Sequence, residues 1–451
     1  MTRRNHLTAF FVALLAVTVL GACSPEQTYP MSSIDPEVDA AMGVPLPDGT
    51  PCHELYEPAR QQDSNGALLP GTHDGDLLSG WAFEMKQPTG FKDHGCQIVT
   101  APHPVRNGSY SFRFEVRDGD CNSYDGGWDD CTNDRSRHEL SQTWRPEAVY
   151  GQDLYPNRAG DEFWYSWSMW LPPKSLQQGK TSTFIGQFNS DNSARFYLRD
   201  FGQGQQPKDG FGYVFNDRNY DLISQDILAS NPGIRGRWVD IMMHVIWSEG
   251  DTGLIELYID GDITEILTGP NMDGATRTTF DFGIYNAFIS KCRCDVMLTQ
   301  HMYFDEIRRG TTREDVEISP DDPDEVEATI GELLGAPTST VTYVEGGGYD
   351  FWPYSLTYPP TGQVVVRFEA LDPTEVALSD QAVVEIVVTA ENWEMFGPSW
   401  RAPQDGIEDG DQTTKVRVSV IAERSDEMYG HIEDQYVSVI SVDRAPSADD
   451  H

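Results

Sequence analysis

The feature that most constrains the fold is a period-two alternation of apolar and polar residues, which recurs from about residue 76 onward. From Tyr110 to Val116 apolar residues occupy every second position, and Phe163–Met169 and Val239–Trp247 repeat the pattern. Such alternation is typical of half-buried strands, because successive side chains point to opposite faces of a sheet. No long segment carries a helical period. The sequence therefore predicts an all-β chain.

The alternating segments fall into two groups. In the first, residues 76–311, Asp260-Gly261 predicts a hairpin turn and Tyr303–Ile307 a closing strand. This group is long enough for two packed sheets. Residues 312–336 crowd carboxylates with prolines and predict an acidic linker, with one short helix near Val326–Leu334.

The second group, residues 337–445, has short strand candidates at regular spacing, which predict a smaller β-sandwich before a tail at 446–451. The candidates are Gln363–Phe368, Ala382–Thr389, Lys415–Ile421 and Tyr436–Val442. Loose motifs in this region resemble the Calx-beta-like, immunoglobulin-type repeats of bacterial surface proteins. They are Val344-Glu345-Gly346-Gly347, Thr389–Trp393 and Ile440–Asp443. The resemblance implies a role in spacing or adhesion.

The N-terminal residues, 1–22, have the pattern of a cleaved export signal. Arg3 and Arg4 precede an apolar run from Leu7 to Leu20, which is too short for an ordinary transmembrane span. The run ends in Leu20-Gly21-Ala22-Cys23, which resembles a bacterial lipobox. That resemblance implies lipidation of Cys23. The alternative is an ordinary secretory signal with an incidental cysteine.

A lipidated cysteine would set where the protein resides. Ser24 follows the cysteine, and by resemblance to sorting in Gram-negative cells this favours the outer membrane. We expect a protein of the bacterial cell envelope, exposed at the surface and held in the membrane by its lipid alone, since two or more acyl chains anchor stably. Residues 23–75 would form the tether and lead-in.

The charge balance excludes one class of partner. The chain has 72 acidic and 32 basic residues and a formal charge of −40, so nucleic-acid phosphates would be repelled. An anionic ligand would need a local cluster of arginine and lysine. We expect a monomer.

The cysteine count favours disulfides. Without Cys23, six cysteines remain, and an even number in an exported chain implies pairing. We favour one bridge that closes a loop and a second that holds the N-terminal segment in place. The two cysteines that remain then form the third bridge by elimination. The pairs are Cys121–Cys131, Cys52–Cys96 and Cys292–Cys294. Metal binding by these thiols is disfavoured, because no paired spacing or histidine partner accompanies them.

The segment Arg135–Leu140 is the first that indicates chemistry. In a strand, Arg135, Arg137 and Glu139 share one face, while His138 points to the other. Charged rows are costly in a core but suit a cleft, and the arginine fork matches a carboxylate. The alternative is a surface ladder of salt bridges. For His138 we favour a structural role over that of a base.

Two acidic groups raise the question of metal ions. Asp118, Asp120 and Asn122 occupy every second position, as the ligands of a calcium loop do, but Ser123 stands where such loops have glycine. A disulfide-closed acidic loop is the alternative. A second candidate group lies in the second sandwich, where a solvated loop is favoured: Glu345, Glu408, Asp409 and Asp411. We predict no catalytic metal and no required cofactor, and leave a structural calcium ion open.

Several elements, in order over about residues 78–315, resemble the jelly-roll polysaccharide lyases of the heparin lyase I and glucuronan lyase type. The matching elements are Arg117-Asp118-Gly119-Asp120, Arg137-His138-Glu139-Leu140, Trp164–Pro172, Gln187-Phe188-Asn189, Gly236-Arg237-Trp238, Asp281-Phe282-Gly283-Ile284-Tyr285 and Tyr303–Gly310. The resemblance implies a β-jelly roll, a concanavalin-like sandwich, and β-elimination on an anionic polysaccharide that contains uronic acid.

Such a lyase removes the proton at carbon 5 of a uronate and expels the oxygen at carbon 4. The carboxylate must be neutralised, for which Arg137 and Gln187 are candidates, with Asn189 as a further donor. By resemblance Tyr285 protonates the leaving oxygen. Nearby arginines are expected to favour its ionised form, which would let it act as the base as well.

The sequence departs from the family pattern at two positions. Asn189 stands where the family usually has histidine, and Asp281 where it usually has lysine. Asparagine cannot act as a base. If the enzyme is active, one tyrosine would then serve both steps on a sugar whose proton and leaving oxygen lie on the same side, as in D-mannuronate and D-glucuronate.

The remaining polar candidates are assigned to substrate binding, with exposed surface as the alternative for the last two: Arg135, Glu139, Arg195 and Arg199. One rival function is a carbohydrate-binding protein without activity, in which Trp164, Trp170 or Trp247 stacks on sugars. A laminarinase-type hydrolase is disfavoured, because Glu256–Asp260 has the wrong spacing for its acidic motif. A purely structural surface lipoprotein is a third rival.

Overall fold

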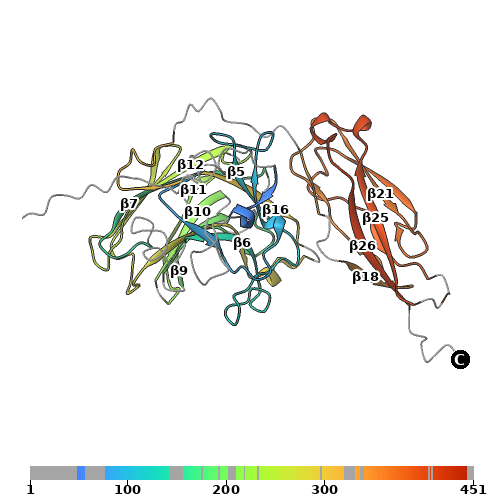
Figure 1. Cartoon of the computed structure of the whole chain (residues 1–451), viewed down its shortest axis with the longest axis horizontal. Helices are drawn as coiled ribbons and strands as arrows, with labels where there is room; N and C mark the ends of the chain where they lie inside the picture. Colours follow the sequence, from blue (N-terminus) through green and yellow to red (C-terminus); the bar gives the residue numbers. More distant parts are fainter. Residues whose placement is uncertain are drawn as a thin grey trace, which may run out of the picture. The chain divides into compact units, whose positions relative to one another are not determined.

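The computed structural model describes residues 48–55, 77–142, 156–173, 176–190, 193–201, 210–217, 219–230, 233–294, 297–318, 331–335, 340–404, 407 and 410–443. Within these ranges there is no α-helix, and the polypeptide forms strands joined by turns and short 3-10 segments, which confirms the all-β prediction (Figure 1). No helix in the described ranges is both long and apolar enough to cross a membrane. The predicted signal and Cys23 lie outside them, and so does the predicted tether and lead-in apart from residues 48–55, so lipid anchoring stays a prediction.

Two large sheets form the first sandwich. The strands of one are β1 (Thr50–Pro51), β2 (Leu78–Ser79), β4 (Cys96–Val99), β5 (Ser111–Val116), β7 (Glu162–Trp170), β12 (Trp238–Ile246), β13 (Leu254–Ile259), β14 (Asp262–Thr268) and β16 (Gln300–Gly310). Their order is β1-β4-β5-β16-β7-β12-β13-β14, with β2 paired to β16. The predicted hairpin at Asp260-Gly261 joins β13 to β14 and is confirmed.

The other sheet carries the polar residues singled out in the sequence. Its strands are β3 (Phe83–Met85), β6 (Arg135–Gln142), β8 (Ser182–Ser190), β9 (Ser193–Phe201), β10 (Gly210–Asn216), β11 (Leu222–Ser230) and β15 (Thr278–Ala287). They follow the order β11-β10-β9-β8-β15-β6-β3, so β15 lies between β6 and β8.

Aromatic side chains join the two large sheets. Phe282 of β15 meets Phe112 and Phe114 of β5 with ring centroids 5.6 and 5.4 Å apart, and Phe304 of β16 at 5.2 Å. All four rings are buried. Because side chains alternate along β15, placing Phe282 in this core directs Asp281 and Tyr285, which have the opposite parity, to the other face of the sheet.

Gly283 is required by the close approach of β15 to β6. Its φ is +133°, and a Cβ there would lie 2.3 Å from the carbonyl oxygen of His138 and 2.9 Å from the Cα of Glu139. Only glycine fits without a backbone shift. The pairing of β15 with β8 also shifts register between Phe282 and Tyr285, which sets the position of the tyrosine.

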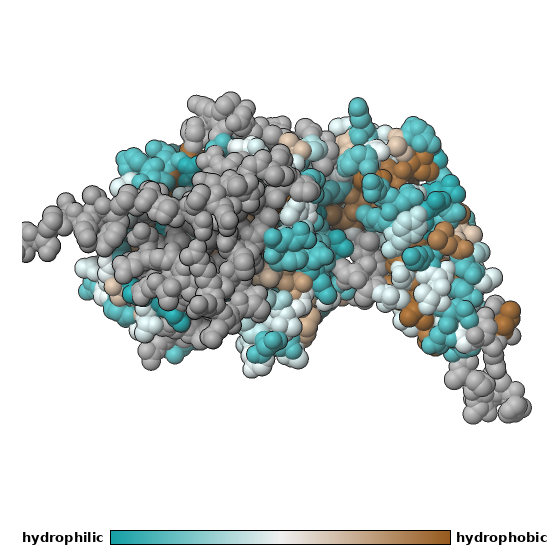
Figure 2. Space-filling model, viewed as in Figure 1, coloured by the Kyte–Doolittle hydropathy of each residue, from teal (hydrophilic) through white to brown (hydrophobic). Residues whose placement is uncertain are grey.

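The second sandwich has its own core. Its five-stranded sheet contains β18 (Val341–Val344), β21 (Val364–Ala370), β23 (Val383–Val388), β25 (Gln412–Val420) and β26 (Gln435–Val442). All but β18 correspond to strands expected from the sequence. Smaller sheets are formed by β19 (Asp350–Phe351), β22 (Ala377–Leu378) and β24 (Ser399–Arg401), and by β17 (Leu333–Leu334) and β20 (Ser355–Leu356). In Figure 2 several apolar side chains show on the surface of this region.

The helix predicted near Val326–Leu334 is wrong at its C-terminal end. Leu333 and Leu334 form β17, pair with β20 and are buried in the second core. Burial of both leucines in a strand outweighs their helical propensity. The rest of that predicted helix lies outside the described residues, apart from Gly331 and Glu332.

The favoured disulfides are the ones that the structure contains. Cys52 joins Cys96, Cys121 joins Cys131, and Cys292 joins Cys294. The bridge from Cys52 ties the N-terminal segment to β4, and the bridge between Cys121 and Cys131 closes the loop that precedes β6.

Candidate active site

Seven side chains of β6, β15 and β8 lie together on the sheet surface opposite the core, and we call this surface the polar face. The register places Arg137 beside Tyr285 and Asp281 beside Gln187. The neighbouring residues of opposite parity, such as Leu140, Phe282 and Phe188, are buried in the core. The polar face comprises Arg135, Arg137, Glu139, Gln187, Asn189, Asp281 and Tyr285.

Tyr285 is held between two arginines. Arg135 donates from Nε to the phenol oxygen at 2.9 Å, and the guanidinium carbon of Arg137 lies 3.8 Å from the ring centroid. Burial nevertheless outweighs both arginines, and the pKa of Tyr285 is raised above its usual value of 10. Both arginines favour the ionised form, as expected, but burial has the larger effect, so the resting phenol is protonated.

Arg137 is balanced by two carboxylates. Its Nε and one terminal nitrogen donate to Asp130 at 2.6 and 2.7 Å, and the other terminal nitrogen donates to Glu139 at 3.1 Å. Burial disfavours the charged guanidinium, but Glu139 and Asp130 together keep the pKa of Arg137 above its usual range. Asp130 was not among the residues expected at the site, because it lies in the loop before β6 rather than in the alternating strand.

Glu139 lies beneath Arg137 and Gln187. The Gln187 amide donates to both carboxylate oxygens, at 2.9 and 3.1 Å. Burial raises the pKa of Glu139 to about 7, since the opposing effect of Arg137 does not cancel it. The amide hydrogens of Gln187 thus point to Glu139, so the expected contact with a substrate carboxylate requires them to reorient.

The two positions that depart from the family pattern contact each other. The Asn189 amide donates to Asp281, which also accepts a hydrogen bond from Ser141 at 2.5 Å. Lys86, just after β3, places its ammonium nitrogen 3.0 Å from the same carboxylate. Although burial disfavours the charged amine, Asp281 leaves the pKa of Lys86 raised, so the cation persists. Lys86, in the segment after β3, thus brings a positive charge next to the position where the family pattern has lysine.

Of the two arginines of β9, the structure describes the side chain of Arg199 alone. The guanidinium of Arg199 lies 4.6 Å from the ring centroid of Phe201, and burial lowers its pKa to about 10. Its half-buried position is compatible with a subsite role and does not establish one. Arg195 belongs to β9, but its side chain lies outside the described residues.

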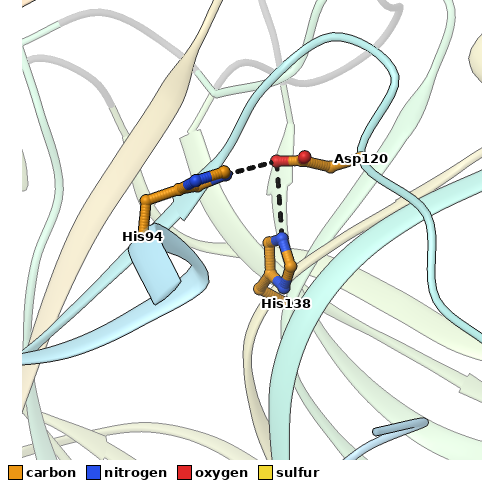
Figure 3. Close-up of side chains that lie close together, drawn as sticks. All are labelled: His94, Asp120 and His138. Carbon is orange, nitrogen blue, oxygen red and sulfur yellow. Dashed lines mark hydrogen bonds and ion pairs between the residues drawn. The ribbon is translucent and has the colours of Figure 1, made fainter. Parts of the chain in front are cut away.

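A compact group lies behind the polar face, where His94 and His138 converge on Asp120 (Figure 3). The two Nε2 atoms lie 2.8 and 3.4 Å from one oxygen of Asp120. Burial disfavours the charged carboxylate, but the contacts with His138 and His94 keep the pKa of Asp120 below its usual range. We call these residues the histidine tie.

The histidine tie has the donor types of a metal site, but its surroundings favour a hydrogen-bonded role. The amide nitrogen of Asn122 lies 3.4 Å from Nδ1 of His138 and donates to the carbonyl oxygen of Arg137 at 2.8 Å. A donor facing Nδ1 places the proton of neutral His138 on Nε2, toward Asp120. A metal-binding histidine needs the opposite arrangement, with its other nitrogen donating to an acceptor.

The first candidate calcium group does not form a recognisable site, and the second lies partly outside the described residues. Asp118 accepts from the backbone of Met297, whereas Asp120 and Asn122 bond to the histidines and to Arg137. The three side chains are committed to different partners, unlike those of a calcium loop. In the second candidate group Glu345 is buried, and Glu408 and Asp409 lie outside the described residues.

Two of the three tryptophans proposed to stack on sugars are not placed to do so. Trp170 and Trp247 are buried, and the indole nitrogen of Trp247 donates to Tyr165 inside the core at 2.8 Å. Trp164 stacks on His244 with centroids 4.3 Å apart. The stacking hypothesis is therefore wrong for Trp170 and Trp247.

An all-β sandwich that carries arginines, a glutamine and a tyrosine on the face of a sheet turned away from the core is an architecture that fits enzymes acting on acidic polysaccharides. Comparison with known families gives the same class: the family model described as polysaccharide lyase matches residues 73–308. The chain belongs to the polysaccharide lyase family.

Solved structures with similar folds include three lyases of low sequence identity. The endo-β-1,4-glucuronan lyase from the fungus Trichoderma reesei is 16% identical, with a TM-score of 0.40, over 55% of this chain and 96% of that one. The alginate lyase from Klebsiella pneumoniae is 11% identical, with a TM-score of 0.33, over 47% and 85%. The alginate lyase from Pseudomonas aeruginosa is 16% identical, with a TM-score of 0.33, over 48% and 88%. No curated protein matches the sequence.

Proposed function

We propose that the protein is a surface-anchored lyase that cleaves a uronate-containing polysaccharide by β-elimination on the polar face. The observation that carries the proposal is the position of Tyr285, whose phenol oxygen accepts from Arg135 while its ring packs against Arg137. These contacts hold a group that can exchange a proton next to two guanidinium groups. Precise placement of that group is what proton transfer requires.

Arg135 is the group best suited to the substrate carboxylate. It bonds to the phenol of Tyr285 and to the carbonyl oxygens of Asn133 and Asp134, whereas Arg137 is already paired with two carboxylates. A uronate carboxylate bound to Arg135 would lie beside Tyr285. Neutralising its charge stabilises the enolate-like intermediate that forms when the carbon 5 proton leaves.

Tyr285 then serves both proton transfers. The ionised phenol takes the proton from carbon 5, the electron pair moves to form the double bond between carbons 4 and 5, and the neutral phenol donates that proton to the leaving oxygen. Asn189 cannot act as a base, and its amide is already directed to Asp281. One tyrosine suffices only where proton and leaving oxygen lie on the same side, so we propose D-glucuronate or D-mannuronate as the cleaved residue.

The test is ultraviolet absorbance of the unsaturated uronate product, with protein that lacks residues 1–23. The substrates are glucuronan, polymannuronate, polyguluronate, heparin and ulvan. We expect cleavage of a glucuronate or mannuronate polymer by the wild type and none by Tyr285→Phe. Cleavage of polyguluronate alone would overturn the proposed stereochemistry.

The alternative is a carbohydrate-binding protein without activity, which the contact between Asn189 and Asp281 favours because both usual family groups are missing. Affinity electrophoresis in gels that contain the same polysaccharides separates the two functions. Retarded migration with no ultraviolet product would select the binding protein.

Surface anchoring through Cys23 is a separate part of the proposal. We expect wild-type protein in the membrane fraction, released by detergent, and Cys23→Ser protein free of lipid. Equal membrane association of both forms would refute the anchor.

A further inference from the structure

A hairpin beside the polar face presents two exposed aromatic rings. It spans residues 121–131, and we call it the disulfide hairpin. Tyr124 and Trp128 are 40% and 46% exposed. The Tyr124 nitrogen donates to the Trp128 carbonyl at 3.0 Å, and Gly127 donates back to the Tyr124 carbonyl at 3.0 Å. These bonds close a tight turn between the two aromatic residues.

The hairpin is held firmly at its base. The Cys121–Cys131 bridge joins its ends, and Ser123 exchanges two backbone hydrogen bonds with Thr89, at 2.8 and 3.2 Å. Asp130 adds a backbone bond to Asn122 at 2.9 Å. Rings presented on a fixed support lose little conformational entropy when a ligand covers them.

Both aromatic side chains are connected to the polar face. The Trp128 indole nitrogen donates to Asp130 at 2.8 Å, and the same carboxylate binds Arg137 through two hydrogen bonds. The indole has no other donor, so what it offers a ligand is its ring. Tyr124 is close enough to Lys86 and Asp281 for both charges to act on its phenol.

Exposed rings beside the polar face suit the apolar face of a sugar, whose C–H groups pack on the negative face of an aromatic system. The hairpin itself is acidic: Asp125, which follows Tyr124 in the sequence, is exposed, and Asp129, which follows Trp128, is half-buried. These carboxylates would repel a uronate carboxylate placed over the rings. A neutral sugar ring meets no such repulsion.

We propose that Tyr124 and Trp128 form a subsite for a neutral sugar residue of the polysaccharide, next to the uronate that is bound at Tyr285. The inference rests on the proposed function and sharpens it. The substrate would be a copolymer of uronic acid and neutral sugar rather than a uniform chain of uronic acid.

The experiment follows the indole N–H resonance of Trp128 by nuclear magnetic resonance, identified by its loss in Trp128→Phe. Tyr285→Phe protein prevents cleavage during the titration. One probe is a hyaluronan hexasaccharide, in which glucuronate alternates with N-acetylglucosamine, and the other a glucuronan hexasaccharide of uronate alone. We expect the Trp128 resonance to shift with the mixed probe and to stay in place with the uniform one.

Affinity for the mixed probe is measured by calorimetry in variants of the hairpin. Trp128→Ala should weaken binding by up to about tenfold, the range expected of one aromatic contact, while Trp128→Phe retains most of the affinity. Tyr436→Ala, which removes an exposed aromatic ring from the second sandwich, is the matched control and should change nothing.

A Trp128 resonance that moves with neither probe would overturn the subsite, and one that moves equally with both would overturn its preference for a neutral sugar. Failure of the lyase proposal is recognised separately. Wild-type protein would then give no ultraviolet product from either polymer, whatever the Trp128 resonance does.

Discussion

Strand β6 carries buried charged or titratable side chains on both of its faces, and the two sets have different partners. Toward the polar face, Arg137 donates to Glu139 and packs against the ring of Tyr285. Toward the other face, His138 belongs to the histidine tie, in which both imidazole Nε2 atoms lie close to one oxygen of Asp120. Under the proposed function, alternate residues of one strand serve chemistry and architecture, and substitutions should separate activity from stability according to face.

The largest expected effect is on catalysis at the polar face. Tyr285→Phe keeps the ring against Arg137 but removes the proton donor, so the turnover should fall about 100- to 10,000-fold with little change in stability. Tyr213→Phe is the matched control, because Tyr213 lies on the core side of the same sheet and donates or accepts at Ser224. Turnover is measured from ultraviolet product, and an equal loss in both variants would remove the distinction between the faces.

The next largest effect is expected where Lys86 meets Asp281. Lys86→Met leaves a fully buried carboxylate without its cation, which should lower the free energy of unfolding by about 3–5 kcal/mol. Lys180→Met, at an exposed position, should change it by less than about 0.5 kcal/mol.

Denaturant titration of the double variant tests the pairing. Combining Lys86→Met with Asp281→Asn should recover much of the lost stability, because the unpaired charge is gone. If the two losses simply add, the pair is not the source of the effect.

A smaller effect on stability, without a matching loss of catalysis, is expected behind the face. Asp120→Asn removes the anion on which His94 and His138 converge and should cost about 1–3 kcal/mol. Because the native pKa of Asp120 is lowered, its contribution is present above the unfolded pKa and is lost as the pH falls through the native value. Turnover per folded molecule that drops as far as in Tyr285→Phe would contradict a purely structural role.

The smallest expected effect is a change in the pH dependence of stability. The native pKa of Glu139 is raised from 4.5 to about 7, so its contribution is greatest below pH 4.5 and is lost as the pH rises through 7. Glu139→Gln resembles the protonated form and should flatten the stability curve in that window. Unfolding curves at several pH values would show this change. If the free energy of unfolding depends on pH in the same way in both proteins, the proton is bound by a group other than Glu139.

Period-two alternation was enough to predict which β6 residues share a face, because side-chain direction in a strand depends only on parity. The same rule placed His138 on the core side, where it is found. The disulfide pairs followed from loop closure and elimination.

The side chains that contact those residues could not be predicted from the sequence. Asp130 reaches Arg137 from a loop, and Lys86 reaches Asp281 across 195 positions of the chain. Neither contact leaves a local pattern. The raised pKa of Tyr285 was not predicted, because charge neighbours can be inferred from register, whereas burial depends on the packed structure.

The most direct test of the central claim is the pH dependence of kcat/KM on a glucuronate or mannuronate polymer that the enzyme cleaves. Because the pKa of Tyr285 is raised above 10 and its ionised form is the proposed base, kcat/KM should rise about tenfold per pH unit over the range in which the protein stays folded. Tyr285→Phe should lack this rise. A rate that levels off near neutral pH, or a variant that keeps the rising limb, would show that another group takes the proton.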